Sequence, residues 1–264
     1  MVTFIGKATY TIEDLRQLVA FLRSENGCPW DKVQTHESIR RNFLEEAYEV
    51  SEAIERDDPA LLREELGDVL LQVMFHAQIK AEEGVFTLDH VADAVCKKLV
   101  SRHPHLFADQ TALDSDQVME NWEAIKRREK AQETVSKSLQ DVATSLPATW
   151  RAEKVGNKAA RAGFDFPDVA AALDKLAEET EELKSALEMD KPKREEELGD
   201  LLFSIVNVAR KLDIDPEDAL NGATDKFIRR FGKVENGLVA QGVSIEDATL
   251  QQMDALWEKH KQEN

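Results

Sequence analysis

The sequence predicts an all-α protein built from two similar helical bundles in tandem. Apolar residues recur at three- and four-residue spacing through long stretches, and no alternating pattern of useful length indicates a strand. Gly and Pro residues divide the chain into segments of helix length. The third observation is an internal repeat, because an acidic motif around Glu46 returns around Glu179, at a spacing of 132 to 133 residues.

Length and composition narrow the class of protein. The 264 residues suffice for two domains that each bury a core. The formal net charge of −18 argues against nucleic acid or an anionic membrane as partner. Cys28 and Cys96 form no C-x-x-C pair, so neither a disulfide framework nor a zinc site is indicated. No signal-peptide pattern and no apolar run of about 18 residues occurs, so we expect a soluble, cytoplasmic protein without an anchor.

In the first half, apolar spacing and its breaks define the helices. Asp58 and Pro59 supply a cap and a first-turn proline for the longest helix, which begins near residue 61. Between Leu66 and Ile79 this helix is apolar nearly all round, so we expect burial on more than one side, with a subunit partner providing part of it. The expected helices cover 12–22, 38–55, 61–82, 88–100 and 115–132.

The stretch 133–145 is polar and weakly periodic, and we place the domain boundary there. The expected division is a first domain over 1–135, a linker over 136–146 and a second domain over 147–264. Gly163, Pro192 and Gly242 break the helical pattern of the second half. The expected helices there cover 148–162, 169–188, 193–212, 216–236 and 250–262.

Two acidic helix segments flank the turn at Pro192. Glu179 and Glu182 are three residues apart, as are Glu197 and Asp200, so each pair shares a helix face. In an antiparallel hairpin the two pairs lie level, and helices about 8–10 Å apart would point all four carboxylates into one small volume. Four carboxylates cannot all stay ionised there without cations. We therefore expect Glu179, Glu182, Glu197 and Asp200 to bind a divalent metal.

A solvated acidic face is the simpler interpretation of any acidic helix. Two features weigh against it here. Glu178 and Glu182 are like charges four residues apart, which destabilises a helix. Glu179 lies on the apolar stripe between Leu176 and Leu183, where a carboxylate would be partly desolvated and would need a partner.

Cations and aromatics follow the acids in the same order in both repeats. A Lys/Arg pair and then a Trp/Lys pair each have four-residue spacing. Cations suit phosphates and an aromatic ring suits stacking on a base, so together with metal-binding acids they indicate a nucleoside polyphosphate site. The second repeat has Lys226 with Arg230 and Trp257 with Lys261; the first has the acids Glu46, Glu49, Glu65 and Asp68, then Lys98 with Arg102 and Trp122 with Lys126.

These motifs resemble the MazG nucleoside triphosphate pyrophosphohydrolases. The resemblance covers nearly the whole chain, in the tandem two-domain form. It rests on Glu45-Glu46-x-x-Glu49 with Glu65-x-x-Asp68, on Glu178-Glu179-x-x-Glu182 with Glu197-x-x-Asp200, and on Gly27-Cys28-Pro29-Trp30-Asp31 and Arg102-His103-Pro104-His105-Leu106-Phe107, which are similar to the family's first domain.

The resemblance implies a dimer of MazG-like all-α bundles that hydrolyses nucleoside triphosphates with Mg²⁺. The substrates would be ribo- and deoxynucleotides, ATP among them, with broad base tolerance, and the products the monophosphate and pyrophosphate. A housecleaning or stress-related role in the nucleotide pool is also implied, as is a link to toxin–antitoxin or stress-response partners.

By motif match, the resemblance assigns roles mainly to the second repeat, and one of two glutamates, Glu178 or Glu179, would activate the water. The first repeat matches at every acidic position, so it offers a second site of Glu46, Glu49, Glu65, Asp68, Lys98, Arg102, Trp122 and Lys126. The expected catalytic residues are Glu178, Glu179, Lys226 and Arg230; the expected substrate contacts are Lys175, Glu178, Glu179, Glu196, Asp200, Lys226, Arg229, Arg230, Trp257 and Lys261.

Two other functions suit an acidic helical bundle. A di-iron carboxylate bundle pairs each Glu with a His three residues on, and the sequence has no Glu-x-x-His. A non-catalytic dimerisation or interaction module would attract a basic partner and would show neither turnover nor metal dependence. The sequence leaves this second alternative open.

Overall fold

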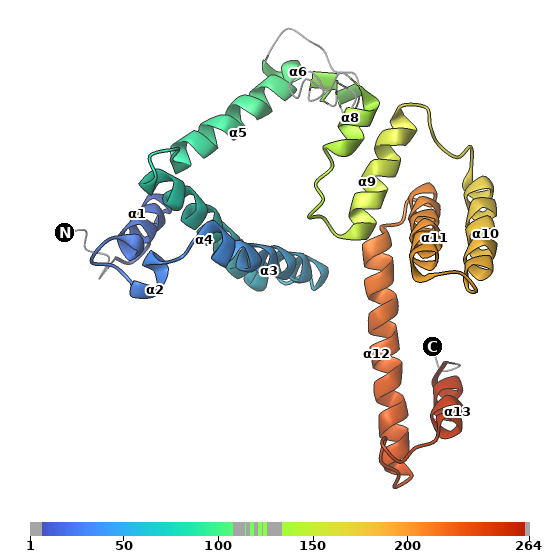
Figure 1. Ribbon diagram of the computed structural model, residues 1–264. Coiled ribbons are helices and arrows are strands. Elements are labelled where there is room, and N and C mark those ends of the chain that lie inside the picture. The colour runs from blue at the N-terminus through green and yellow to red at the C-terminus, as the bar shows by residue number, and fades with distance from the viewer. Residues whose placement is uncertain are drawn as a thin grey trace. The chain divides into compact units, whose positions relative to one another are not determined.

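The computed structural model shown in Figure 1 is all-α, as predicted: among the residues that it describes, helices joined by loops and turns are the only regular secondary structure. The described residues are 7–107, 114, 117–118, 121–122, 124–125 and 134–261. The expected helix over 115–132 therefore lies largely outside them. The chain divides into two compact units, Met1–Lys126 and Arg127–Asn264. Within the described residues, no helix combines the length and apolar character needed to cross a membrane.

Unit 1 is built on a hairpin of two long helices, α3 (His36–Glu55) and α4 (Pro59–Glu82). Asp57 takes a left-handed conformation at the turn, with φ of 50°. Asp58 then caps α4 by accepting hydrogen bonds from the backbone N–H groups of Ala60 and Leu61, and Pro59 occupies the first turn. The remaining helices of the unit are α1 (Ile12–Arg23), α2 (Pro29–Lys32), α5 (Leu88–Arg102) and α6 (Pro104–Phe107).

The core of unit 1 lies where α1 meets the hairpin. Its apolar part consists of Val19, Ile39, Met74, Phe75 and Ile79. The sequence predicted Met74 and Phe75 in a helix buried on more than one side, and both are buried, although Leu66 of the same helix is 51% exposed. The expected subunit partner on this helix stays a prediction.

Arg23 joins three segments of unit 1. Its Nη1 donates to the backbone carbonyls of Asp31, at 2.7 Å, and Gln34, at 3.1 Å. Its Nε and Nη2 donate to the carboxylate of Glu82, at 3.0 and 2.9 Å. The Arg23 side chain is only 5% exposed, so these charge-assisted bonds also satisfy a buried cation.

Unit 2 is organised around a second hairpin, α10 (Val169–Ala186) and α11 (Lys191–Lys211), against which α9 (Ala148–Arg161) packs. Asp190 caps α11 through the backbone N–H of Lys193. Helix α12 (Pro216–Ala240) leads away from the hairpin, and α13 (Leu250–Lys261) lies along its far part (Figure 1). A short helix, α8 (Val135–Gln140), occupies part of the expected linker and packs on α9.

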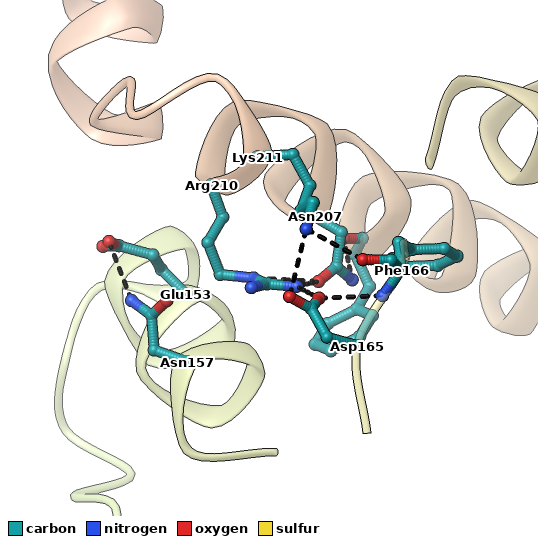
Figure 2. A network of polar contacts seen from close by, with 8 residues as sticks. Glu153, Asn157, Asp165, Phe166, Asn207, Arg210 and Lys211 are labelled. Atoms are coloured by element: carbon teal, nitrogen blue, oxygen red, sulfur yellow. Dashed lines mark hydrogen bonds and ion pairs between the residues drawn. The ribbon is translucent and has the colours of Figure 1, made fainter. Parts of the chain in front are cut away.

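A network of polar contacts holds the loop between α9 and α10 against the end of α11 (Figure 2). Arg210 donates to the carboxylate of Asp165. Lys211 Nζ lies 3.1 Å from Asp165 Oδ2 and donates to the carbonyl of Phe166 at 2.8 Å. The Arg210 hydrogen bond, and secondarily that of Lys211, lowers the pKa of Asp165 to about 2.

Gly156 allows α9 to approach α11 closely beside this network. A Cβ at that position would lie 3.0 Å from Arg210 Nε and 3.1 Å from Asn207 Oδ1. Arg210 cannot move away freely, because it is 8% exposed and bonded to Asp165. Gly156 therefore sets the spacing between the two helices.

We expect Gly156→Ala to be less stable than Gly222→Ala by at least about 1 kcal/mol, because overpacking is costly and both changes gain the same helix propensity. Gly222 is the matched control, since a Cβ there meets nothing within 4 Å. Urea unfolding monitored by circular dichroism measures the difference. Equal free energies of unfolding would contradict the close α9–α11 contact.

A pair of stacked histidines lies between α3 and α4. His36 Nδ1 and His76 Nδ1 are 2.7 Å apart, so one ring donates to the other, and the ring planes differ by 2°. Burial, and secondarily the charge of His36, lowers the pKa of His76 below its ordinary value of 6.5. The neutral form of His76 is therefore favoured in the folded protein.

Stability should decrease as pH falls below about 6.5, because the unfolded chain then binds a proton at His76 that the folded chain does not. We expect the melting temperature of wild type to fall more steeply between pH 7.5 and pH 5.5 than that of His76→Gln. Parallel melting curves in this interval would show that the histidine pair does not contribute.

Candidate active site

Three carboxylates converge between α10 and α11. Glu179 of α10 is 5% exposed and Glu197 of α11 is 6% exposed, while Asp200 is exposed. One carboxylate oxygen from each lies within 4.8 Å of the others. We call Glu179, Glu197 and Asp200 the acid cluster. The sequence predicts four convergent carboxylates from a level, antiparallel pairing of the two helices, and three of the four lie together here.

Lysines on the same two helices contact the buried glutamates. Lys175 Nζ lies 2.8 Å from Glu179 Oε1, and Lys193 Nζ lies 2.6 Å from Glu197 Oε1. Each lysine also contacts the preceding glutamate, Lys175 with Glu178 at 2.8 Å and Lys193 with Glu196 at 3.0 Å. These carboxylate hydrogen bonds raise the pKa of both lysines above the usual range.

The second oxygens of the two buried glutamates are not satisfied. Glu179 Oε2 and Glu197 Oε2 are buried and have no hydrogen-bond partner among the described residues. A buried carboxylate oxygen without a partner is costly. Carboxylate oxygens that converge in this way are the ligands that a hard divalent cation prefers, so the residues present fit a metal such as Mg²⁺.

Glu182, the fourth expected ligand, lies at the edge of this group. It is exposed and is not among the three that converge. Desolvation raises its pKa, and the negative charge of Glu179 adds to that effect, as does Glu197 to a smaller extent, while Lys175 opposes it. The structure therefore places Glu182 within electrostatic reach of the acid cluster.

Unit 1 repeats the acids but not the lysines. One carboxylate oxygen each of Glu46, Glu49 and Glu65 lies within 4.8 Å of the others. Desolvation is the largest cause that raises the pKa of Glu46, followed by a hydrogen bond with Glu49 and the charge of Asp68. Desolvation and the neighbouring acids likewise raise the pKa of Glu65. At the positions equivalent to Lys175 and Lys193, this repeat has Asn42 and Leu61.

Two of the predicted residues of unit 2, Arg230 of α12 and Trp257 of α13, lie against each other. The guanidinium carbon of Arg230 lies 6.0 Å from the ring centroid of Trp257, and the ring of Phe227 lies 5.1 Å from the same ring. Arg230 Nε is buried and has no partner among the described residues. Lys226 and Arg229 are exposed, and Lys261 pairs with Glu258 at 3.3 Å.

Unit 1 has the same cation–aromatic contact. The guanidinium carbon of Arg102 lies 5.0 Å from the ring centroid of Trp122. Lys98 is exposed, and Lys126 lies outside the described residues. The recurrence of this contact in both units supports the internal repeat that the sequence indicated.

The acid cluster and the Arg230–Trp257 pair are separate within one chain. Helix α12 packs mainly on α13 and only lightly on α9 and α11, and it leads away from the α10–α11 hairpin (Figure 1). In the described part of unit 2, no hydrogen bond or ion pair joins the acid cluster to Lys226, Arg230, Trp257 or Lys261. A pocket that combines the acid cluster with these cations and Trp257 stays a prediction.

Lys193 is not among the site residues expected from the sequence. The signal was present, because Lys193 precedes Glu197 by four residues as Lys175 precedes Glu179. On a helix this spacing places a lysine against a carboxylate. Only the structure shows that both glutamates so contacted are the buried ones.

Comparisons with known proteins agree on one family. The family profile described as the MazG nucleotide pyrophosphohydrolase domain matches residues 34–107 and 168–234. A Thermotoga maritima protein named nucleoside triphosphate pyrophosphohydrolase/pyrophosphatase MazG is 42% identical over 255 residues, which is 97% of each chain. An Escherichia coli K12 protein named nucleoside triphosphate pyrophosphohydrolase is 44% identical over 257 residues, 96% of this chain and 97% of that protein. An uncharacterized Bacillus subtilis protein is 45% identical over 94% of this chain and 51% of its own length.

Proposed function

Since this chain belongs to the MazG nucleotide pyrophosphohydrolase family, we propose that it hydrolyses nucleoside triphosphates to monophosphate and pyrophosphate in a reaction that requires Mg²⁺. Membership makes it an enzyme of nucleotide hydrolysis. The proposal adds the identity of the metal, the range of bases and sugars, the site residues and the biological role.

The observation that supports this proposal best is the pair of buried glutamate oxygens without partners. Glu179 Oε2 and Glu197 Oε2 belong to carboxylates that converge with Asp200. Glu179, Glu197 and Asp200 would hold the metal, with Glu182 at its side. Bound there, Mg²⁺ would neutralise phosphate charge and make the α-phosphorus a better electrophile.

A glutamate beside the acid cluster would activate the water. Glu178 and Glu179 are the two candidates, and Glu178 suits the role better because Glu179 is buried and committed to the metal. Lys175 contacts Oε1 of Glu178, and the Glu178 side chain is 58% exposed, so water can reach it and the other oxygen would accept the proton. The water would attack the α-phosphorus in line and pyrophosphate would leave.

The remaining substrate contacts divide between the α10–α11 hairpin and the pair of helices α12 and α13. Lys175 and Glu196 flank the acid cluster, and Asp200 is its exposed member. Arg230 presents a buried N–H that has no partner among the described residues, which suits a phosphate oxygen. Trp257 would stack on the base, and since every base offers an aromatic face, broad base tolerance follows. The proposed substrate contacts on α12 and α13 are Lys226, Arg229, Arg230, Trp257 and Lys261.

A second copy of the chain would complete the site. Every residue from 218 to 229 of α12 is exposed, including Phe227 at 56% and Ile228 at 61%. On α11 beside the acid cluster, Leu198 and Leu202 are 47% and 55% exposed. An apolar face of this kind marks a protein interface. A symmetric dimer would cover it and could bring the cations and Trp257 of one copy to the acids of the other.

The proposed role is control of the nucleotide pool, as housecleaning or under stress, in the cytoplasm. The formal net charge of −18 disfavours nucleic acid and anionic membranes as partners. Unit 2 is the main catalytic candidate, because it buries two glutamates whose second oxygens have no partner among the described residues, whereas the convergent unit 1 acids are half-buried or exposed. The division into domains over 1–135 and 147–264 with a linker over 136–146 is part of the same proposal.

We expect Glu197→Gln to lower pyrophosphate release at least about 100-fold. The metal would lose a carboxylate ligand and would no longer be held where it can polarise the α-phosphate. Glu65→Gln is the matched control, since Glu65 is the equivalent acid of unit 1, and it should keep most of the activity. The assay measures pyrophosphate and orthophosphate from a nucleotide mixture with Mg²⁺. Undiminished pyrophosphate release by Glu197→Gln would remove the acid cluster from the reaction, and orthophosphate as the product would contradict the bond proposed.

Ile228→Asp should convert the dimer to a monomer and abolish hydrolysis, because a charge on the apolar face of α12 prevents its burial. Val239→Asp is the control, since Val239 lies on the same helix and is 67% exposed. Analytical ultracentrifugation gives the mass, and the pyrophosphate assay gives the activity. An active monomer would contradict the two-chain site and leave the acid cluster unaffected.

A further inference from the structure

We propose that Lys175 and Lys193 are the resident counter-ions of the acid cluster. Each lysine neutralises one buried glutamate when no metal is bound, and each competes with the metal for that carboxylate. The inference rests on the proposed function, because it assumes that the acid cluster binds the metal. The two lysines are positioning residues for metal ligands, a role distinct from contact with substrate.

The use of the carboxylate oxygens supports this assignment. Glu179 Oε1 and Glu197 Oε1 each accept a hydrogen bond from a lysine Nζ, at 2.8 and 2.6 Å. Oε2 of both residues is buried and has no partner among the described residues. One oxygen of each carboxylate is thus fixed by an ammonium group, which leaves the other oxygen for a cation.

Burial makes the lysines necessary. Two glutamates that are 5% and 6% exposed lose most of their hydration, and a positive charge beside each carboxylate offsets the cost of burying it. The side chains of Lys175 and Lys193 are 36% and 40% exposed, so each lysine lies between the acid cluster and the solvent. Each precedes its glutamate by one helical turn, and since the helices are antiparallel, they approach from opposite ends of the cluster.

The first repeat provides an internal comparison. Its acids occupy the same positions, but Asn42 and Leu61 replace the lysines. Glu46 and Glu65 of that repeat are only half-buried, and Glu49 is exposed. The repeat with the lysines buries its glutamates, and the repeat without them does not. This difference is expected if lysines provide the charge balance that allows burial.

An arriving dication would take over the role of the two ammonium groups. Without the lysines, the metal-free cluster would lose its charge balance, whereas the metal-bound cluster would keep it. Removal of a lysine should therefore destabilise the metal-free protein more than the metal-bound protein. By thermodynamic linkage, the variant must then bind the metal more tightly.

The experiment measures Mg²⁺ binding by calorimetry and melting temperature without metal, both in the absence of nucleotide. The full chain is used at pH 8, with Glu65→Gln in every protein so that the unit 1 acids are weakened. We expect Lys175→Met and Lys193→Met each to melt about 3 °C lower without metal and to bind Mg²⁺ about fivefold more tightly. Lys175→Arg and Lys193→Arg should restore both values, because arginine keeps the charge.

Matched controls are Lys184→Met and Lys191→Met. These lysines form the same kind of intrahelical ion pair, with Glu181 and Glu195, at 2.7 and 3.2 Å, but those glutamates are exposed. Neither control should change the Mg²⁺ affinity or the metal-free melting temperature. A change equal to that of the cluster lysines would show that only the general charge of the surface matters, and would overturn the proposal.

The outcomes separate this inference from the proposed function. If the parent protein hydrolyses nucleotides and binds Mg²⁺, but Lys175→Met and Lys193→Met bind it equally or less tightly, the counter-ion role alone is overturned, and the lysines serve the substrate only. A parent that takes up no Mg²⁺ overturns both. If a methionine variant does not fold without metal, Mg²⁺ should restore its folding, and a chain that stays unfolded in Mg²⁺ contradicts the proposal.

Discussion

The burial of two glutamates at one level of the α10–α11 hairpin is the constraint on which the rest of unit 2 depends. Glu179 and Glu197 face each other from neighbouring helices, and neither is more than 6% exposed. The two carboxylates repel each other and lose their hydration on burial, and a positive charge nearby offsets both costs. Intrahelical lysines supply it on one oxygen of each carboxylate, and the unsatisfied second oxygens are where a cation fits.

The scaffold around the hairpin keeps this level pairing fixed. Asp190 sets the start of α11, and at the other end of the hairpin Asp165, Arg210 and Lys211 bind the incoming loop to α11. Gly156 brings α9 into close contact beside them. A slip of the hairpin by one residue would rotate the carboxylates away from each other, so these contacts at the ends protect the geometry in the middle. Helices α12 and α13 pack mainly on each other and only lightly on α9 and α11, so the proposed site takes its cations and tryptophan from a second chain.

The two repeats show how one scaffold can support two electrostatic designs. Both have convergent acids and both have an arginine over a tryptophan ring, at 5.0 Å in unit 1 and 6.0 Å in unit 2. In unit 1 desolvation, followed by the neighbouring acids, raises the pKa of Glu46 and Glu65. In unit 2, by contrast, Lys175 and Lys193 place a positive charge against each buried glutamate. The difference lies in two side chains, Asn42 and Leu61 in unit 1 against Lys175 and Lys193 in unit 2.

The sequence by itself determined the helices and the face that each acid occupies. Apolar spacing placed α1, α3, α4, α5 and α9 to α13 within a few residues of their observed ends, and three-residue spacing put Glu179 and Glu182 on one side of α10 and Glu197 and Asp200 on one side of α11. These are local properties, set by the helical repeat and by caps. The sequence did not indicate α8, whose short, polar helix is supported by packing on α9. Tertiary structure decided which carboxylates are buried, which oxygens lack partners, that Lys193 belongs with Lys175, and that Arg230 and Trp257 lie apart from the acids. Burial and separation depend on how whole helices pack, and spacing along the chain carries no information on that.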